Sequence, residues 1–157
     1  MTFGRMPEPG PIVCGVDDSP EARDAARVAG AISERLGLDV LLVHVAAAVT
    51  QPGVGAAAAG RERLAASERE DAEEVLARIA AEAGLADRAG RRVEFGDAAG
   101  RLLAVCEEVG AELVVVGSRG RGKVRRALLG TVSNQVAASA PCVAVVVPPG
   151  SAERLTL

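Results

Sequence analysis

Leu113-Val-Val-Val-Gly-Ser-Arg-Gly120, with Gly130-Thr-Val-Ser133 after nine intervening residues, is the stretch of this chain that decides its fold. The apolar run 113–116 predicts a buried strand, and the glycine and basic residues after it predict a loop leading to a helix near Thr131. Glycines let a backbone approach an anion, and the N–H groups of a helix N-terminus attract negative charge. The pattern therefore predicts a phosphate-binding loop. A tight strand-to-helix turn with Thr131 as an ordinary N-cap is the alternative.

Strand and helix patterns alternate along the rest of the chain. Further buried strands are predicted at 12–16, 39–45, 92–95 and 142–147, and helices at 19–36, 61–83, 98–109 and 131–138, with a loop over 46–60. Such alternation implies parallel strands joined by right-handed crossovers, with helices on both faces of the sheet. The sequence therefore predicts an open, doubly wound, Rossmann-like α/β fold.

The length of 157 residues fits one domain, which we expect over 12–149, between a leader at 1–11 and a tail at 150–157. Nearly half of the residues, 49%, are hydrophobic, yet Phe3 and Phe95 are the only aromatic ones. The core must therefore consist of Val, Leu, Ile and Ala, which suits strands covered on both faces. The chain has three cysteines, Cys14, Cys106 and Cys142, and no two of them form a CxxC pair. Because their number is odd, we expect three packed thiols and no disulfide framework.

The net charge of −3 gives no general attraction to nucleic acid or to an anionic membrane, so neither is expected as a partner. No apolar run is long enough to span a bilayer, and residues 1–7 lack the hydrophobic region of a signal peptide. A cytoplasmic location is the expectation. The basic residues after the fourth strand are the local exception, and one or two of them are expected to contact phosphate.

Ligands of doubly wound sheets bind at the carboxyl ends of the strands where the winding reverses. Asp17 follows the first strand and Gly117 ends the fourth, so adjacent first and fourth strands would bring residues 100 positions apart to one crevice. Asp17 would then contact a ribose hydroxyl or a magnesium-phosphate group. The alternative is that Asp17 only caps the first helix, but Asp18 and Ser19 also fit that capping role. His44, the only histidine, is interpreted as a hydrogen-bonded core residue and not as a catalytic base.

From residue 12 to residue 147 the sequence resembles the universal stress protein family. The ATP-binding subgroup of that family carries Gly-x2-Gly-x9-Gly-(Ser/Thr), which here is Gly117, Gly120, Gly130 and Thr131. Val-Asp-Asp-Ser at 16–19, Leu-Val-His-Val at 42–45 and Ala-Pro-Cys at 140–142 also match family signatures. Ala98 stands where many relatives have proline, which affects a turn and no site residue.

The resemblance implies the strand order 3-2-1-4-5 and a homodimer paired through the last strand, Cys142 to Val147. It places Gly15, Val16 and Asp17 near ribose and adenine and Val45 against the adenine. It places six further residues around ribose and phosphates: Gly117, Gly120, Gly130, Thr131, Val132 and Ser133. The charge argument adds two arginines to this set, Arg119 and Arg121.

The leading interpretation is an adenine-nucleotide-binding protein that takes ATP, or ADP or AMP, with Mg²⁺ held by the nucleotide and Asp17, and that acts as a nucleotide-dependent module in a stress response. Slow ATP hydrolysis at the same site is an alternative, although no catalytic residue that orients water is visible in the sequence. A protein-interaction module with a vestigial site is the third interpretation.

Overall fold

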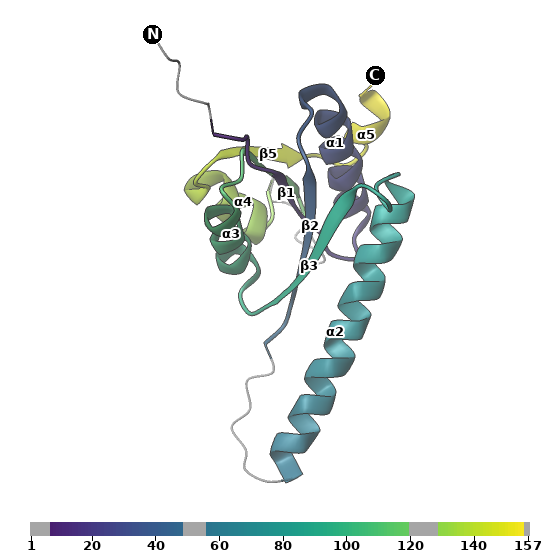
Figure 1. Ribbon diagram of the computed structural model, residues 1–157, viewed down its shortest axis with the longest axis vertical. Coiled ribbons are helices and arrows are strands. Elements are labelled where there is room, and N and C mark those ends of the chain that lie inside the picture. The colour runs from purple at the N-terminus through teal and green to yellow at the C-terminus, as the bar shows by residue number, and fades with distance from the viewer. Residues whose placement is uncertain (1–6, 49–55, 120–128, 156–157) are drawn as a thin grey trace.

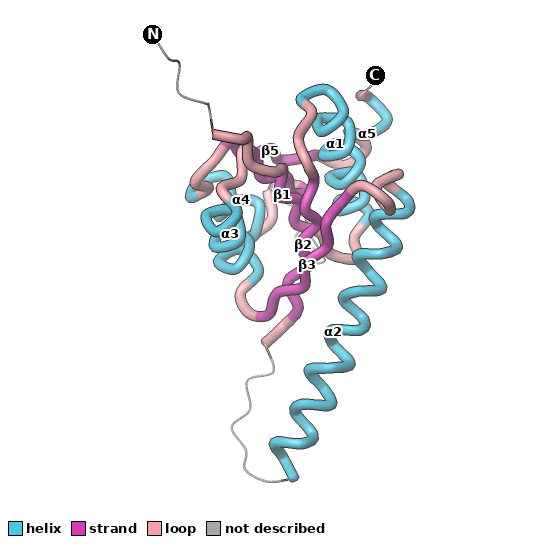
Figure 2. The backbone as a smooth tube through the Cα atoms, viewed as in Figure 1, coloured by secondary structure: helices cyan, strands magenta, loops and turns pink. Residues whose placement is uncertain are grey.

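The centre of the sheet is the pair β1 (Ile12–Gly15) and β4 (Leu113–Gly117), and the other strands extend outward from it. In the computed structural model, which describes residues 7–48, 56–119 and 129–155, five strands pair in parallel in the order β3-β2-β1-β4-β5 (Figure 1, Figure 2). β2 (Val40–Ala46) and β3 (Ala89–Phe95) lie on one side of the central pair, and β5 (Val143–Val147) lies on the other. This order confirms the predicted fold.

Helices cover both faces of the sheet. α1 (Pro20–Leu36) and α2 (Ala56–Glu82) pack on one face, whereas α3 (Ala98–Val109) and α4 (Thr131–Ser139) pack on the other (Figure 1). Successive strand residues point to opposite faces, so each strand contributes to both cores. The first core contains the strand residues Ile12, Cys14, Val40, Leu42 and Val115, and the second contains Val13, Val43, Val114 and Val116.

Capping residues fix the ends of α1 and α3. Ser19 is the N-cap of α1, and its hydroxyl accepts a first-turn backbone N–H at 3.2 Å. Asp97 does the same for α3, where its Oδ2 accepts an N–H at 2.7 Å. Both helices end at a glycine in the left-handed region, Gly37 with φ 68° and Gly110 with φ 62°. These four helix ends agree with the sequence prediction.

The starts of α2 and β3 differ from the prediction. α2 begins at Ala56, inside the expected loop 46–60, because the alanines at 56–59 are strong helix formers and the single Gly60 does not stop the helix. β3 begins at Ala89 and not at residue 92, since Ala89, Gly90 and Arg91 form no apolar run and no alternating pattern, and two of the three are exposed. Residues 49–55 of the expected loop lie outside the described residues.

The expected C-terminal tail contains a short helix, α5 (Ser151–Arg154). Gly150, with φ 74°, makes the turn into it and donates its N–H to Asp24 Oδ2 of α1 at 2.8 Å. At the other end of the chain, Gly10 donates to Glu112 Oε1 at 3.2 Å, and the Glu112 N–H donates to Pro11 O at 3.0 Å. The last residues of the expected leader are thus bonded to the start of β4, whereas residues 1–6 lie outside the described residues.

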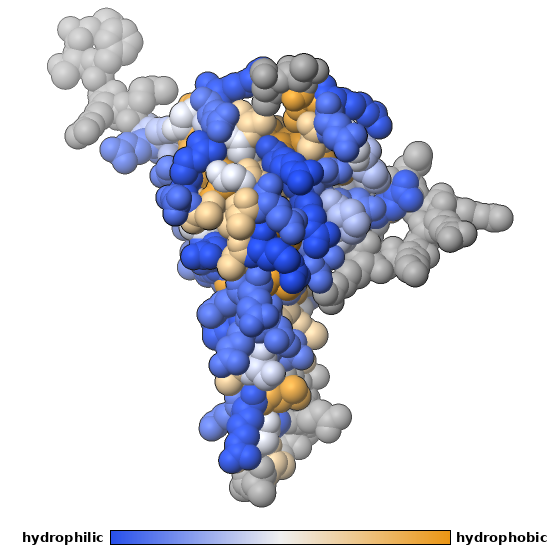
Figure 3. Space-filling model, turned by 90° about the vertical axis from the view of Figure 1, so that its right-hand side faces the viewer, coloured by the Kyte–Doolittle hydropathy of each residue, from blue (hydrophilic) through white to orange (hydrophobic). Residues whose placement is uncertain are grey.

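α2 contacts the sheet with only its C-terminal half. Its buried residues start at Ala72 and continue with Leu76, Ile79 and Ala80, while the half before them extends beyond the sheet (Figure 1). Viewed from the α2 side, this projecting half is mostly hydrophilic with isolated hydrophobic residues (Figure 3). Leu64 is 49% exposed. None of the helices in the described part of the chain combines the length and apolarity needed to cross a membrane.

Replacing Ile79 with Ala should destabilise the protein by about 2–5 kcal/mol, because Ile79 is fully buried and its truncation leaves a cavity between α2 and the sheet. Leu64→Ala on the same helix is the matched control and should change stability by no more than about 0.5 kcal/mol. Urea unfolding followed by circular dichroism measures both values. Equal effects of the two substitutions would contradict the assignment of α2's buried half.

Candidate functional site

The carboxyl ends of β1 and β4 open into one cavity of about 410 Å³. The two strands are direct neighbours, with Ile12 paired to Leu113 and Cys14 to Val115. Ten of the twelve predicted site residues line this cavity: Gly15, Val16, Asp17, Val45, Gly117, Arg119, Gly130, Thr131, Val132 and Ser133. The other two, Gly120 and Arg121, lie outside the described residues.

Hydrogen bonds to Ser118 hold the start of α4 against the end of β4. The Ser118 carbonyl accepts the Gly130 N–H at 2.6 Å and the Ser133 hydroxyl at 2.8 Å, and the Ser118 N–H donates to Val147 O of β5 at 2.9 Å. Ser118 and Ser133 are both buried. The Ser133 hydroxyl proton is thus committed to the backbone, so the group that Ser133 can offer as a donor at the cavity is its backbone N–H.

Among the residues that the structure describes, no side chain caps the N-terminus of α4. Its N-cap is Gly130, whereas α1 and α3 are capped by Ser19 and Asp97. The first intrahelical bond of α4 runs from the Asn134 N–H to Gly130 O at 3.0 Å, so the N–H groups of 131–133 precede the helical ladder. All three of these residues line the cavity. Together they present backbone donors and the positive end of the helix dipole to whatever occupies it.

Two glycines of the site are required by packing. A Cβ on Gly117 would lie 2.9 Å from Glu21 Cβ and 3.1 Å from its backbone carbonyl, so the first turn of α1 can approach the end of β4 only because residue 117 has no side chain. A Cβ on Gly15 would lie 2.7 Å from Leu102 Cδ2. The sequence argument assigned Gly117 to the phosphate loop, and the resemblance placed Gly15 near ribose and adenine. At both positions protein atoms fill the space that a side chain would need.

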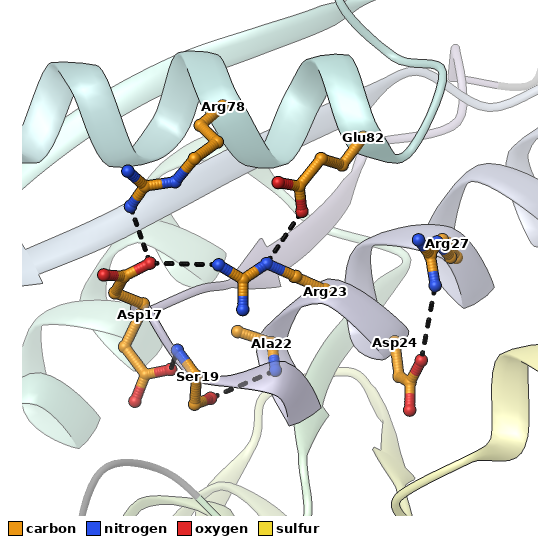
Figure 4. Close-up of polar contacts among 9 residues, drawn as sticks. Asp17, Ser19, Ala22, Arg23, Asp24, Arg27, Arg78 and Glu82 are labelled. Carbon is orange, nitrogen blue, oxygen red and sulfur yellow. Dashed lines mark hydrogen bonds and ion pairs between the residues drawn. The ribbon is translucent and has the colours of Figure 1, made fainter.

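Asp17 lines the cavity and also shapes the entry to α1. Its Oδ1 accepts the Ser19 N–H at 3.0 Å, and the Ser19 hydroxyl then caps the helix (Figure 4). Of the two expected caps, Ser19 is the N-cap of α1, and Asp18 Oδ1 pairs with Arg78 of α2 at 2.6 Å and with Arg23 at 3.3 Å. Asp17 therefore has a local structural role in addition to its place at the cavity.

An ion-pair cluster joins this turn to α2. Arg23 of α1 pairs with Glu82 of α2 at 2.7 Å in addition to Asp18, and the side chains of Arg23, Arg78 and Glu82 converge between the two helices (Figure 4). These side chains are 29–46% exposed, so each pair contributes little to stability by itself. Their effect is to fix the position of α1's first turn relative to α2.

The floor of the cavity is apolar. Val43 and Val45 of β2 and Val116 of β4 lie beside Leu102 of α3. His44, between the two β2 valines, points to the opposite face, where its Nδ1 donates to Val16 O at 2.8 Å. Because a carbonyl only accepts, this nitrogen carries the ring proton. The contact agrees with the interpretation of His44 as a hydrogen-bonded residue, although its side chain is half-buried and lies outside the two described cores.

The α3 wall of the cavity is tied to β3 by Glu94. Its carboxylate accepts Arg101 Nη2 at 2.6 Å and Arg92 Nε at 2.5 Å, and its side chain is only 12% exposed. The hydrogen bond from Arg101, with that from Arg92, holds the pKa of Glu94 below its ordinary value even though burial acts in the opposite direction. Glu94 therefore stays charged, and its hydrogen bond from Arg101 holds α3 against β3.

Charged groups are few at the cavity. Within the described ranges, Asp17 and Arg119 are the ionisable residues of its lining, and no cluster of three His, Cys, Asp or Glu side chains could hold a metal ion. The cavity therefore combines an apolar floor, one acid, one base and a row of backbone donors. This arrangement suits an elongated ligand with one flat apolar part and one anionic part.

Sequence reasoning did not identify several residues of the lining, namely Ser19, Ala22, Val43, Ala98, Leu102, Val116 and Leu129. Strand alternation could have found Val43, because it lies two positions from Val45 and shares its face. The residues of α1 and α3 carried no such signal, since their place depends on how the helices pack.

Comparison with known proteins gives one consistent result. Residues 9–148 match the model of the universal stress protein family. A universal stress protein of Mycobacterium tuberculosis is 32% identical over 143 residues, and one of Mycolicibacterium smegmatis is 35% identical over 147. These alignments cover 83% and 88% of this chain, but the chain spans only 42% and 46% of the two relatives.

Solved structures show the same fold at lower identity. Universal stress protein UspA of Lactobacillus plantarum has a TM-score of 0.74 at 18% identity, over 90% of this chain and 99% of that one. A universal stress protein in complex with cAMP scores 0.70 at 21% identity, over 90% and 98%. One from Archaeoglobus fulgidus in complex with dAMP scores 0.65 at 21%, over 88% and 97%.

Gly117→Ala should destabilise the protein by about 1–3 kcal/mol, because the new methyl group would overlap the backbone of Glu21 and push α1 away from the cavity. Gly60→Ala is the matched control: nothing lies within 4 Å of a Cβ at that exposed position in α2, so alanine should stabilise the helix by about 0.5–1 kcal/mol. Thermal unfolding of both variants tests the packing role. A neutral Gly117→Ala variant would disprove it.

Proposed function

Because the chain belongs to the universal stress protein family, we propose that it binds an adenine nucleotide, with ATP as the leading ligand, and acts as a nucleotide-dependent regulatory module in a stress response. The site is the cavity between β1 and β4. The chain spans less than half the length of the two mycobacterial relatives it matches. The proposal therefore concerns this domain and not the activity or partners of the longer proteins. The cytoplasmic location stays a prediction from the sequence.

The uncapped N-terminus of α4 carries this proposal. A helix start is normally satisfied by a Ser, Thr, Asp or Asn side chain, as α1 and α3 are here. In α4 a glycine occupies that position, so an anion in the cavity can accept from the backbone N–H groups of 131–133. A phosphate satisfies these donors and the helix dipole together.

The apolar floor supports an adenine nucleotide over a free phosphate. A cavity of about 410 Å³ is within the range of small-molecule sites, and its valines and Leu102 offer a surface for a flat base. The complexes of family members with cAMP and dAMP support the same ligand class. We assign the base to Val16 and Val45, the ribose to Gly15 and Asp17, and the phosphates to the start of α4.

Mg²⁺ would arrive with the nucleotide. The described residues hold no cluster able to bind the metal alone, and Asp17 is the carboxylate that the cavity lining offers. Arg119, at the phosphate end, would supply positive charge. Since Asp17 already accepts the Ser19 N–H, we propose binding in preference to hydrolysis, which would need a residue that orients water.

Gly130→Val should weaken the binding of magnesium-ATP by about 100-fold or more, because its side chain would stand between the α4 donors and the phosphates. The backbone of Gly130 has φ −74° and ψ 172°, which valine adopts freely, so the variant should still fold. Isothermal titration calorimetry on nucleotide-free protein measures both affinities.

Gly60→Ala, far from the cavity, is the binding control and should titrate as the unmodified chain does. Phosphate release in the same samples tests hydrolysis, and any true turnover must disappear in Gly130→Val. If the unmodified chain is folded and free of nucleotide but binds none, the site assignment fails, and a protein-interaction module becomes the better interpretation.

We also propose a homodimer formed by pairing of β5, the edge strand next to β4. Val143 at its start is 62% exposed, whereas Val145 packs on the core next to α1. An apolar edge strand left uncovered promotes association. Val143→Lys should therefore shift the sedimentation profile toward monomer without unfolding the chain. An unchanged profile would contradict pairing through this strand.

A further inference from the structure

The turn between β1 and α1 meets the cavity on one side and α2 on the other. Three of its residues, Val16, Asp17 and Ser19, line the cavity. Asp18 lies outside that lining, and its Oδ1 accepts a hydrogen bond from Arg78 Nη2 of α2 at 2.6 Å. Two consecutive carboxylates of one short turn thus have different neighbours, because Asp17 meets the proposed nucleotide and Asp18 meets a helix.

The part of α2 that makes this contact is firmly attached to the sheet. Arg78 precedes Ile79, which is fully buried in the core between α2 and the sheet. Glu82, one turn further along α2, accepts Arg23 Nε of α1 at 2.7 Å, and Arg23 also pairs with Asp18 at 3.3 Å (Figure 4). The Asp18 carboxylate is therefore held by one arginine of α2 and by one arginine of α1 that is itself tied to α2.

Holding Asp18 also holds Asp17. The Asp17 Oδ1 accepts the Ser19 N–H at 3.0 Å, so this hydrogen bond spans Asp18. Because each peptide unit is planar, a rotation of the backbone at Asp18 changes both that bond and the direction of the Asp17 carboxylate. The ion pair with Arg78 opposes such a rotation from outside the cavity.

From these contacts we propose that Arg78 is a positioning residue of the nucleotide site, which acts through Asp18 to hold the turn at 16–19 in its binding conformation. The inference rests on the proposed function, in which Gly15 and Asp17 hold the ribose. Arg78 lies outside the cavity lining and touches no ligand itself. Its loss lowers the fraction of molecules whose turn is ready to bind, and the apparent affinity falls by the same fraction.

The coupling between Arg78 and the nucleotide is reciprocal. If the ion pair strengthens nucleotide binding by some factor, a bound nucleotide strengthens the ion pair by the same factor. The side chain of Arg78 is 46% exposed, so the occupancy of the cavity is transmitted to the outer surface between α1 and α2. A competitor for the Arg78 guanidinium would in turn weaken nucleotide binding.

Arg78→Ala should weaken the binding of magnesium-ATP by about 3- to 5-fold, which is near the limit that an exposed ion pair can supply. Isothermal titration calorimetry on the full, nucleotide-free chain measures this change. Arg78→Lys keeps a charged donor and should recover most of the affinity. Arg88→Ala is the matched control, because Arg88 is 50% exposed and pairs at 2.9 Å with Glu34 near the other end of α1; it should bind as the unmodified chain does.

Asp18→Ala tests whether Arg78 acts through Asp18 and not through its charge alone. If it does, adding Arg78→Ala to Asp18→Ala should cause no further loss of affinity. A second loss of about 3- to 5-fold in the double variant would overturn the proposal. An unchanged affinity of Arg78→Ala would overturn it as well.

Hydrogen exchange followed by NMR on the ligand-free chain tests the turn without any nucleotide. The Ser19 and Ala22 N–H groups are bonded to Asp17 and Ser19, so both should exchange faster in Arg78→Ala and at the unmodified rate in Arg88→Ala. Equal rates in the three proteins would contradict the positioning role. If the unmodified chain binds no nucleotide, the proposed function fails, and the exchange rates still decide whether Arg78 positions the turn.

Discussion

The hydrogen-bonded pairing of β1 with β4 is the constraint on which the rest of the structure depends. The chain winds from β1 toward β3 with its helices on one face, then crosses to β4 and winds the other way with its helices on the opposite face. Because the helices diverge at this pair, the carboxyl ends of the two strands are left uncovered. The cavity, the turn at Asp17 and the start of α4 all derive their positions from that divergence.

The strands and most helix ends could be predicted because their signals are local. Apolar runs mark the buried strands, and Ser19, Gly37 and Gly110 mark helix ends through their own capping chemistry. What could not be predicted depends on contacts between distant segments. Gly117 has no side chain because Glu21 lies against it, and the Ser133 hydroxyl is committed because Ser118 faces it. Neither pairing has a sequence signature, so the sequence predicted residues that line one cavity but did not predict the packing and hydrogen-bonding roles of Gly117 and Ser133.

The site combines rigid support with backbone N–H groups that precede the helical ladder of α4. Ser118 accepts two hydrogen bonds and donates a third, which together fix α4 to β4 and β5. A glycine N-cap stabilises a helix less than a Ser, Thr, Asp or Asn N-cap does. The hydrogen bonds of Ser118 hold the start of α4 in place although Gly130 provides no such cap. Within the described part of the site, the donors of α4 are thus fixed in direction, so the proposed ligand would meet preoriented N–H groups there.

The uneven anchoring of α2 divides this one helix into two parts of different cooperativity. The C-terminal half opens only if the core opens, because Leu76 and Ile79 are buried in it. The half before Ala72 contributes no fully buried side chain to the described core and contacts β3 through Arg69, whose guanidinium lies 5.1 Å from the Phe95 ring centroid. It therefore depends largely on alanine propensity and its own backbone ladder, which alone give a helix only marginal stability in water. Fraying can therefore begin at Ala56 and advance toward Ala72 at a low free-energy cost, while amide protons beyond that point stay protected until the sheet itself unfolds.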